Sequence, residues 1–287
     1  MKILVTGVKG QLGFDVVHVL KENAHVVIGV DVEEMDITKA DVVRDFITKV
    51  KPDAVIHCAA YTAVDAAEDN PALCMAVNAV GTESIAKVCK ELDIKMMYIS
   101  TDYVFPGEGE SPWKPEDVRQ PLNVYGKSKY QGELAIEKYL SKYFIVRIAW
   151  VFGVNGNNFV KTMLKLSRDR DVISVVDDQI GSPTYTADLA VLLAEMIETD
   201  KYGKYHATNE GLCTWYEFAK EIFRQAQIDM QVNPVTSDKF PVKAKRPHNS
   251  RLDKCKLVEQ GFQPLPTWQD ALGRYLRTIQ EQEDGYA

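Results

Sequence analysis

The sequence predicts an α/β protein in which a doubly wound parallel sheet carries a smaller C-terminal lobe. Short apolar runs alternate with amphipathic stretches through the first 150 residues, which predicts strands separated by helices. A glycine-rich turn lies between the first apolar run and the first amphipathic stretch, and the alternation loosens after Trp150. Strands separated by helices must pair in parallel through right-handed crossovers, so the first half is expected to form a doubly wound sheet.

The expected elements of the first half follow in order. Buried strands are predicted over residues 2–6, 25–30, 53–58, 94–100 and 144–150, because these runs are short, apolar and rich in β-branched residues. Amphipathic helices are predicted over residues 10–22, 39–50, 71–92 and 124–140. Pro71 suits the first turn of its helix, where a backbone N–H has no helical partner.

The second half is predicted to form a lobe that packs on this core. Residues 158–168, 186–198 and 214–227 are expected to be helical, with Thr214 as an N-cap, and residues 203–208 are expected to form a strand. The basic, proline-bearing residues 238–250 are expected to form a loop. We therefore divide the chain into residues 1–150 and residues 151–287, with some elements of the second part returning to the core.

Composition excludes several classes of function. The chain has 287 residues, 46% of them hydrophobic, and a formal net charge of −7. An acidic protein gains nothing from counterion release, so no nucleic-acid partner is expected. No window approaches the roughly 18 consecutive apolar residues of a membrane span, and no signal peptide is expected. The cysteines are odd in number and scattered, which predicts a reduced, cytoplasmic protein without a zinc site: Cys58, Cys74, Cys89, Cys213 and Cys255.

The strongest local signal is the segment Thr6-Gly7-Val8-Lys9-Gly10-Gln11-Leu12-Gly13, which follows a strand and opens a helix. Gly7 permits a tight turn, Gly10 allows a pyrophosphate near the backbone, and Gly13 allows close packing of helix on strand. Gln11 and Leu12 begin the helix, whose free N–H groups and positive dipole end attract phosphate. This context predicts a Rossmann-type site for NAD(P), and the Gly-x-x-Gly-x-x-Gly spacing resembles the extended short-chain dehydrogenases.

The cofactor choice is left open by two residues of opposite charge. Asp31 follows the second strand, where a carboxylate binds the ribose hydroxyls and repels a 2′-phosphate, which favours NADH. Lys9 in the glycine turn attracts that phosphate and favours NADPH. The resemblance implies an adenine-side contact at Asp36 and Ile37, although Asp36 has an equally good interpretation as a helix N-cap or turn residue. The small residues of the segment Ala59-Ala60-Tyr61 let the backbone approach the cofactor.

Tyr125 and Lys129 form the predicted catalytic pair. They are four residues apart on an expected helix, so both side chains lie on one face. A free phenol has a pKa near 10, and a nearby ammonium lowers the pKa by stabilising the phenolate. Thr101 ends the fourth strand, where ligands of open α/β sheets collect, and its hydroxyl is placed to bind a substrate carbonyl. The order of Thr101, Tyr125 and Lys129 resembles the short-chain dehydrogenase triad.

Several further segments resemble the dTDP-4-dehydrorhamnose reductases and run through the chain in that family's order. They are Ala59-Ala60-Tyr61-Thr62-Ala63-Val64-Asp65, Ser100-Thr101-Asp102-Tyr103-Val104-Phe105, Pro121-Leu122-Asn123-Val124-Tyr125-Gly126, Arg147-Ile148-Ala149-Trp150-Val151-Phe152, Gly156-Asn157-Asn158-Phe159, Asp178-Gln179-Ile180-Gly181-Ser182-Pro183-Thr184 and Arg246-Pro247-His248-Asn249-Ser250-Arg251-Leu252.

The resemblance implies NAD(P)H-dependent reduction of the C4 ketone of dTDP-4-dehydro-L-rhamnose to dTDP-L-rhamnose. Tyr125 would donate the proton, Thr101 would polarise the carbonyl, and Lys129 would orient the nicotinamide ribose. The residue after Asp102 is Tyr103, whereas sugar-nucleotide dehydratases carry a second acid there, which favours a plain reductase.

The lobe over residues 151–287 would then bind the substrate. Beyond the triad, the resemblance implies substrate contacts from Asp102, Tyr103, Trp150, Asn158 and either Arg246 or Arg251. Trp150 would lie beside the sugar ring, and one of the two arginines would clamp the pyrophosphate.

Two alternative functions stay open. One is a reductase or epimerase of another nucleotide-linked keto sugar. The other is a non-catalytic regulatory subunit of methionine adenosyltransferase, against which the presence of both Tyr125 and Lys129 argues. A monomer or homodimer is expected. Some relatives form dimers through Mg²⁺ held by glutamates, but the matching position here is the shorter Asp15 and no other ligands are located, so no metal site is predicted.

Overall fold

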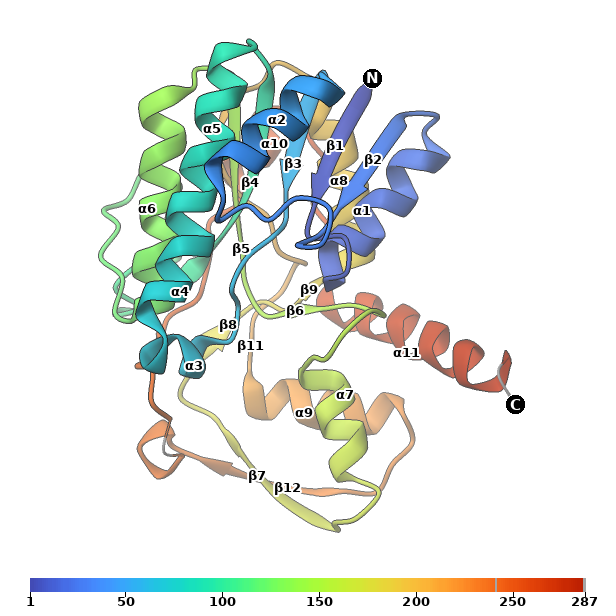
Figure 1. Cartoon of the computed structure of the whole chain (residues 1–287). Coiled ribbons are helices and arrows are strands. Elements are labelled where there is room, and N and C mark those ends of the chain that lie inside the picture. Colours follow the sequence, from blue (N-terminus) through green and yellow to red (C-terminus); the bar gives the residue numbers. More distant parts are fainter. Residues whose placement is uncertain (241, 286–287) are drawn as a thin grey trace.

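The central sheet is the framework of the fold (Figure 1). The computed structural model describes residues 1–240 and 242–285. Within them, six parallel strands form a sheet in the order β10-β5-β4-β3-β1-β2. This confirms the predicted doubly wound parallel sheet. The strands are β1 (Lys2–Thr6), β2 (Val26–Val30), β3 (Ala54–His57), β4 (Lys95–Thr101), β5 (Tyr143–Ile148) and β10 (Gly203–His206).

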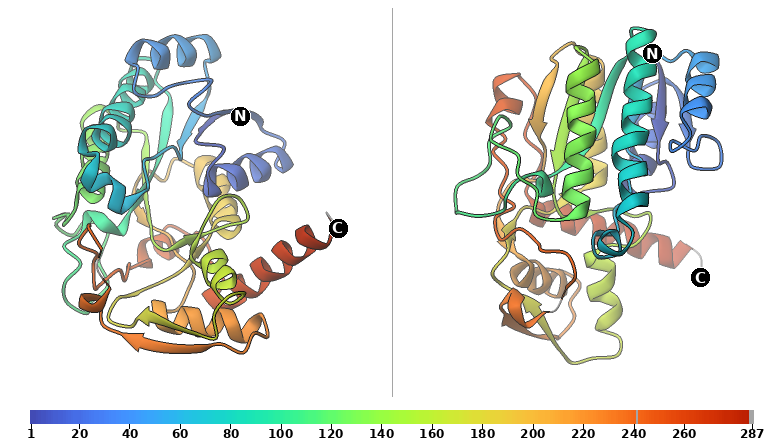
Figure 2. Two further views of the ribbon diagram at one scale, coloured as in Figure 1. Left: turned by 60° about the horizontal axis from the view of Figure 1, so that its bottom comes forward. Right: turned by 60° about the vertical axis from the view of Figure 1, so that its left-hand side comes forward.

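Helices cover both faces of this sheet, as two views of the ribbon make clear (Figure 2). On one face α1 (Gln11–Glu22) packs beside α8 (Thr186–Ile197), and α10 (Cys255–Glu259) lies near β10. On the other face lie α2 (Ala40–Val50), α5 (Thr82–Glu91) and α6 (Val124–Tyr139). The central strands are therefore buried on both sides, which explains why their sequences are almost continuously apolar.

The predicted helix over residues 71–92 is continuous but not regular. It consists of α4 (Pro71–Met75), a π-helical segment η1 (Ala76–Gly81) and α5, and the short α3 (Val64–Asp69) precedes it. An apolar period does not reveal a π-helical turn, because the turn changes the hydrogen-bond register and not the composition. The 21 residues from Pro71 to Glu91 are long and apolar enough to cross a membrane, but half of their apolar window is buried against the rest of the protein.

The fifth strand ends earlier than predicted, before Trp150. Residues 144–150 were expected to be extended, but β5 ends at Ile148 and Trp150 has a left-handed φ of 51°. The chain turns there into β6 (Val151–Phe152), which pairs with β9 (Thr184–Tyr185). The left-handed turn directs the chain out of the sheet and into the lobe. The strand predicted over residues 203–208 also ends early, at His206.

The second part of the chain contributes to both halves of the molecule. Its α8 packs on α1 and its β10 extends the sheet beside β5. The remainder forms the lobe, with α7 (Phe159–Leu166), α9 (Trp215–Gln225) and α11 (Trp268–Gly285) around an aromatic core. Two small strand pairs complete it, namely β7 (Val172–Val176) with β12 (Gln231–Val235) and β8 (Ile180–Gly181) with β11 (Cys213–Thr214).

The lobe contains several elements that the sequence did not predict, among them β7, β12 and α11. Thr214 does cap α9, in a reciprocal capping box with Glu217. The predicted loop over residues 238–250 begins inside a short 3-10 turn, η3 (Ser237–Lys239). Its residues 240 and 242–250 form no helix or strand. Residue 241 of this predicted loop lies outside the described residues.

Candidate active site

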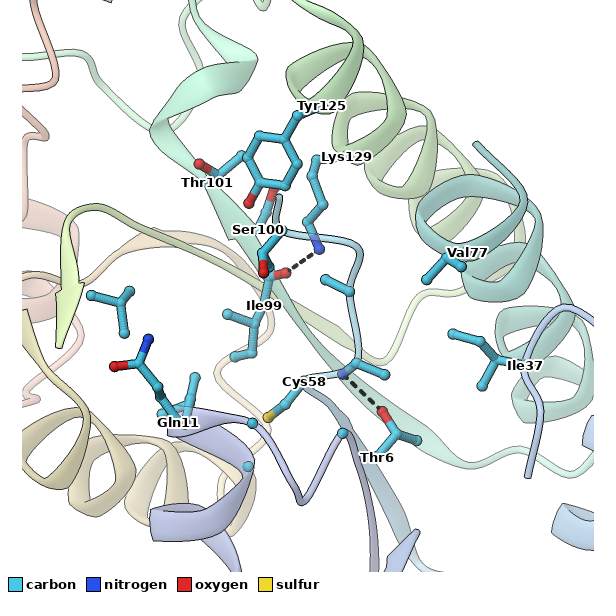
Figure 3. Close-up of a pocket in the computed structure, with 18 of the residues that line it drawn as sticks. Thr6, Gln11, Ile37, Cys58, Val77, Ile99, Ser100, Thr101, Tyr125 and Lys129 are labelled. Atoms are coloured by element: carbon cyan, nitrogen blue, oxygen red, sulfur yellow. Dashed lines mark hydrogen bonds between the residues drawn. The ribbon is translucent and has the colours of Figure 1, made fainter. Parts of the chain in front are cut away.

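A cleft of about 740 Å³ opens at the carboxyl edge of the sheet, where the strands β1 to β5 end. Ligands of open α/β sheets bind at this edge. Figure 3 shows the cleft with α6 on one side and the glycine turn on the other. Most of the predicted site residues line it: Gly7, Gly10, Gln11, Leu12, Gly13, Asp31, Asp36, Ile37, Ala59, Ala60, Thr101, Asp102, Tyr103, Tyr125, Lys129 and Trp150.

The glycine turn has the geometry of a phosphate cradle. Gly7 has a φ of 71°, and a Cβ there would lie 2.6 Å from the backbone nitrogen of Ala59. A Cβ on Gly13 would lie 2.2 Å from the carbonyl oxygen of Gly7, so helix and turn are in direct contact. Gly10 is the N-cap of α1 and no side chain caps that helix end. The first N–H groups of α1 therefore have no side-chain partner, and an anion can take that place.

Asp31 and Lys9 both border the cleft, but each already has partners. The Asp31 carboxylate accepts hydrogen bonds from the backbone N–H groups of Lys9, at 3.0 Å, and Val32, at 2.9 Å. The Lys9 ammonium forms an exposed ion pair of 2.7 Å with Glu33. Asp31 therefore holds the glycine turn in place as well as bringing charge to the edge of the cleft.

Asp36 has the role of a turn residue. Its Oδ1 accepts hydrogen bonds from the backbone N–H of Thr38, at 3.1 Å, and from the Thr38 hydroxyl, at 2.6 Å. These bonds and the nearby Lys39 ammonium lower its pKa. The alternative interpretation of Asp36 as a turn residue thus has direct structural support, whereas the N-cap of α2 is Lys39. The segment also lines the cleft through Ile37 and Thr38.

Thr101 and Tyr125 meet at the end of β4. Both side chains line the cleft, and the Thr101 hydroxyl donates to Asp102 Oδ1 at 2.9 Å and accepts from the backbone N–H of Tyr103 at 3.2 Å. Burial raises the pKa of Tyr125, and the Thr101 contact opposes this only in part. The phenol is therefore protonated near neutral pH, which suits a proton donor.

The predicted effect of Lys129 was to lower the pKa of Tyr125, but the structure places its ammonium against β4. Its ammonium donates a 2.7 Å hydrogen bond to the carbonyl oxygen of Ile99, drawn in Figure 3, and lies 4.1 Å from the centre of the Tyr98 ring. Burial lowers the pKa of Lys129 to about 7, and the Glu133 carboxylate partly offsets that effect. The expectation that the ammonium lowers the pKa of Tyr125 is therefore wrong for this structure, because burial dominates the phenol.

Asp102 and Trp150 form the part of the cleft nearest the lobe. Asp102 is 3% exposed, and burial raises its pKa to about 6 although Ser250 and Thr101 donate hydrogen bonds to it. Trp150 stacks on Trp215, with ring centres 3.8 Å apart and planes 16° apart. Trp150 thus brings a flat apolar face to the cleft and is fixed in place by the aromatic core of the lobe.

Four predicted residues are not among those that line the cleft: Tyr61, Asn158, Arg246 and Arg251. Asn158 caps α7, and its amide donates to Gln11 at 3.2 Å and to the Tyr275 hydroxyl at 3.1 Å. The amide of Asn158 therefore already has hydrogen-bond partners within the protein, and it joins the lobe to α1.

The two arginines lie in the segment that passes beside α3. Arg246 forms a 2.6 Å ion pair with Asp65, and Arg251 donates to Asn249 Oδ1 at 3.0 Å. A hydrogen bond of 2.7 Å from the backbone N–H of Tyr61 to Asn78 fixes the loop after β3. The Nη1 of Arg246 is buried without a hydrogen-bond partner, so this guanidinium keeps a donor that its ion pair with Asp65 does not use.

Asp15 lies on the inner side of α1. It is 8% exposed and faces Thr186 of α8, its Oδ2 is buried without a hydrogen-bond partner, and burial raises its pKa. Within residues 1–240 and 242–285, no group of three or more His, Cys, Asp or Glu side chains is arranged to hold a metal ion. Asp15 therefore packs between two helices of the core.

A set of buried polar residues behind the cleft was missed. Glu133 and Arg147 are both fully buried and form a bidentate ion pair, with both N···O distances 2.8 Å. Ser100 donates a 2.6 Å hydrogen bond to the same carboxylate. A signal was present, because Glu133 follows Lys129 at the helical spacing that joins Tyr125 to Lys129. Its partners come from distant parts of the chain, which no local pattern reveals.

Comparison with known proteins identifies relatives over the whole length. The family described as RmlD substrate binding domain matches residues 1–281. A dTDP-4-dehydrorhamnose reductase of Aggregatibacter actinomycetemcomitans is 41% identical over 94% of this chain and 97% of its own length. The corresponding reductase of Escherichia coli is 37% identical over 97% of this chain and 98% of its own length.

Solved structures agree. A dTDP-4-dehydrorhamnose reductase of Clostridium acetobutylicum is 42% identical, with a TM-score of 0.95 over 98% of this chain and 100% of that one. The reductase of Bacillus anthracis, solved in complex with NADP, is 41% identical, with a TM-score of 0.94 over 96% of this chain and 99% of that one. A UDP-glucose 4-epimerase of Thermus thermophilus, 19% identical with a TM-score of 0.83, shares the fold. The chain therefore belongs to the RmlD family, together with the dTDP-4-dehydrorhamnose reductases.

Proposed function

We propose that this chain reduces the C4 ketone of dTDP-4-dehydro-L-rhamnose to give dTDP-L-rhamnose, with NADPH or NADH as the reductant. One observation carries the proposal. Thr101, Tyr125 and Lys129 converge on the same cleft as the glycine turn, in a chain that is 41% identical to a reductase of this name. A proton donor, a carbonyl anchor and a dinucleotide cradle are the parts that such a reduction needs.

The cleft fits a nicotinamide dinucleotide. The uncapped start of α1 and the small residues Gly10, Ala59 and Ala60 leave the backbone open to a pyrophosphate and its riboses. Asp31 and Lys9 stand where an adenosine ribose is expected in this fold. When bound, the cofactor supplies the hydride that reaches the carbonyl carbon. Because the Bacillus anthracis relative binds NADP and Asp31 favours NADH, both reductants stay within the proposal.

The reaction assigns a distinct task to each residue of the triad. To bind the ketone oxygen, the Thr101 hydroxyl turns its single proton away from Asp102, which accepts it in this structure, while the Tyr103 N–H still donates to the hydroxyl oxygen. Tyr125 stays protonated because burial raises its pKa, and it gives its proton to the oxygen as negative charge develops there. Lys129 donates to the Ile99 carbonyl at the wall of the cleft, where its ammonium can bind ribose hydroxyls.

The second half of the chain is proposed to supply most of the substrate-binding lobe. Trp150 offers a rigid flat face to the deoxyhexose, since its ring is stacked on Trp215. Tyr103 packs edge-on against Tyr125, with ring centres 5.5 Å apart, and narrows the cleft at the reacting end. Arg251 or Arg246 would bind the diphosphate through guanidinium N–H groups that its present contact does not use.

The proposal places the enzyme in the cytoplasm, as a monomer or homodimer without a nucleic-acid or membrane partner. Mg²⁺ has no proposed catalytic part, since Thr101 and Tyr125 already direct two hydroxyls at the carbonyl site.

The test is turnover of dTDP-4-dehydro-L-rhamnose with NADPH and with NADH, followed by cofactor absorbance and by identification of the product. UDP-linked and other dTDP-linked 4-keto sugars serve as controls. Faster turnover of one of these controls would support the alternative reductase or epimerase. No turnover of any keto sugar, together with binding to a methionine adenosyltransferase, would support the regulatory alternative.

A further inference from the structure

The helix α6 contacts the end of β4 at three successive residues. Tyr125 reaches Thr101, Lys129 donates to the carbonyl oxygen of Ile99, and Glu133 accepts a 2.6 Å hydrogen bond from the Ser100 hydroxyl. Tyr125, Lys129 and Glu133 are each four residues apart, so all three lie on one face of α6. Glu133 is thus the third residue on this face of α6 that contacts the end of β4.

Arg147 fixes this third contact from the neighbouring strand. In the sheet Arg147 of β5 lies directly opposite Ser100 of β4, and its guanidinium binds both oxygens of Glu133. Both side chains are fully buried, and Arg119 adds a further 2.8 Å bond to Glu133. The carboxylate is therefore ionised: burial opposes this, but Arg147, Ser100 and Arg119 together lower its pKa to about 2.

Glu133 also contributes the negative charge near Lys129. The other titratable groups that face Lys129 are neutral near pH 7, because burial lowers the pKa of His57 to about 3 and raises the pKa of the thiols and phenols. Those groups are His57, Cys58, Cys74, Tyr98 and Tyr125. The Glu133 carboxylate consequently counteracts the burial that would otherwise remove the proton from Lys129.

From this geometry we propose that Glu133, fixed by Arg147, is a positioning residue of the active site. It holds Ser100, and with it the strand end that carries the Ile99 carbonyl and Thr101, and its negative charge favours the charged form of Lys129. The proposal rests on the proposed reductase function. Since Glu133 does not line the cleft, it acts through these neighbours and not on the substrate.

The first experiment tests the hydrogen bond to the strand end. Ser100→Ala removes that bond and leaves the ion pair intact. The single-turnover rate with dTDP-4-dehydro-L-rhamnose and NADPH is expected to fall about 2- to 10-fold, as the loss of one hydrogen bond of ordinary strength implies. The dissociation constant for NADPH should stay within about twofold of the wild type.

The second experiment tests the charge. Glu133→Gln combined with Arg147→Met removes both buried charges, since removal of one partner alone would leave the other unpaired. NMR of lysine-labelled protein follows Lys129, whose signal is assigned by its loss in Lys129→Arg. In the double variant its titration should move to lower pH, on the order of one pH unit for the loss of a neighbouring charge. The alkaline fall of the single-turnover rate should move in the same direction, because Lys129 loses its proton at lower pH.

Glu137→Gln is the matched control. Glu137 follows Glu133 by one turn of α6 and also pairs with Arg119, at 2.9 Å, and with Lys204 of β10, at 3.3 Å, and both of these partners lie outside β4. The proposal is overturned if both test variants have the same single-turnover rate and the same Lys129 titration as this control. If the double variant does not fold, Ser100→Ala decides alone, and a rate within twofold of the wild type refutes it. The titration needs no substrate, so a wild type without turnover would refute the proposed function separately.

Discussion

Removal of the Tyr125 hydroxyl is the sharpest test of the proposed chemistry. Tyr125→Phe deletes the proton donor and keeps the ring that packs against Tyr103. General acid catalysis contributes about 10²- to 10⁴-fold, so the single-turnover rate of ketone reduction should fall by that factor. This corresponds to about 3 to 5.5 kcal/mol of lost transition-state stabilisation.

The same substitution should leave the fold almost unchanged. Thr101 loses one contact but keeps its bonds to Asp102, at 2.9 Å, and to the Tyr103 N–H, at 3.2 Å. The loss of one hydrogen bond of this kind costs about 1 kcal/mol, or roughly 2 °C in Tm for a chain of this size. The affinity for NADPH should stay within a few-fold of the wild type, because the glycine turn and Lys129 are untouched.

The assay combines rapid mixing of enzyme, NADPH and dTDP-4-dehydro-L-rhamnose with a separate fluorescence titration of NADPH. Tyr130→Phe is the control, since Tyr130 lies on the same helix, packs against Arg119 and does not line the cleft. A single-turnover rate in Tyr125→Phe equal to that of Tyr130→Phe would refute Tyr125 as the proton donor. An equal loss of NADPH affinity and rate would indicate a binding role instead.

Three further outcomes are expected. Asp31→Asn should shift the ratio of the kcat/KM values for NADPH and NADH towards NADPH, and Lys9→Ala should shift it towards NADH. Each shift should be about fivefold, as expected for one exposed charge near a 2′-phosphate. Both ratios are measured side by side, and no change in either would show that both side chains lie away from the ribose. Burial raises the pKa of Asp102 to about 6, above its value of about 3.9 in the unfolded chain, so the folded state binds the extra proton and the free energy of unfolding falls as pH rises from about 4 to 6. Asp102→Asn should remove this fall, which amounts to about 2 kcal/mol between pH 4.5 and pH 7, in urea unfolding at those two pH values, whereas parallel pH profiles of variant and wild type would contradict the burial argument. Activity and sedimentation should be indifferent to EDTA and to added Mg²⁺, because Asp15 is buried against Thr186; activity that disappears with EDTA and returns with Mg²⁺ as a dimer forms would show that Asp15 still serves as a ligand.

Much of the fold could be predicted because its signals are local. The buried strands are short apolar runs, and the glycine turn requires small residues at fixed positions, as Gly7 and Gly13 show by their contacts with Ala59 and with the turn itself. Tyr125 and Lys129 could be paired from spacing alone, since the helical repeat puts both on one face. The parallel order of the first strands follows from the helices between them.

The elements that were missed depend on non-local pairing. The strands β7 and β12 pair across more than fifty residues of chain, and neither has an apolar run as strong as those of the main sheet. The return of β10 to the sheet depends on β5 being available at its edge. Trp150 leaves the sheet through a left-handed backbone turn that its residue type does not favour, so only packing against Trp215 and Gly181 accounts for it.

The sequence by itself predicted the first five strands of the sheet, the glycine turn and the residues proposed as the catalytic triad, because each has a local pattern or a fixed helical spacing. The protonation states of those residues depend on the tertiary structure. The depth of burial raises the pKa of Tyr125 and lowers that of Lys129 to about 7, and burial depends on every element packed around them. The Glu133–Arg147 ion pair and the Arg246–Asp65 contact likewise join distant segments. Electrostatic energies depend on distance and on exclusion of water, and folding sets both.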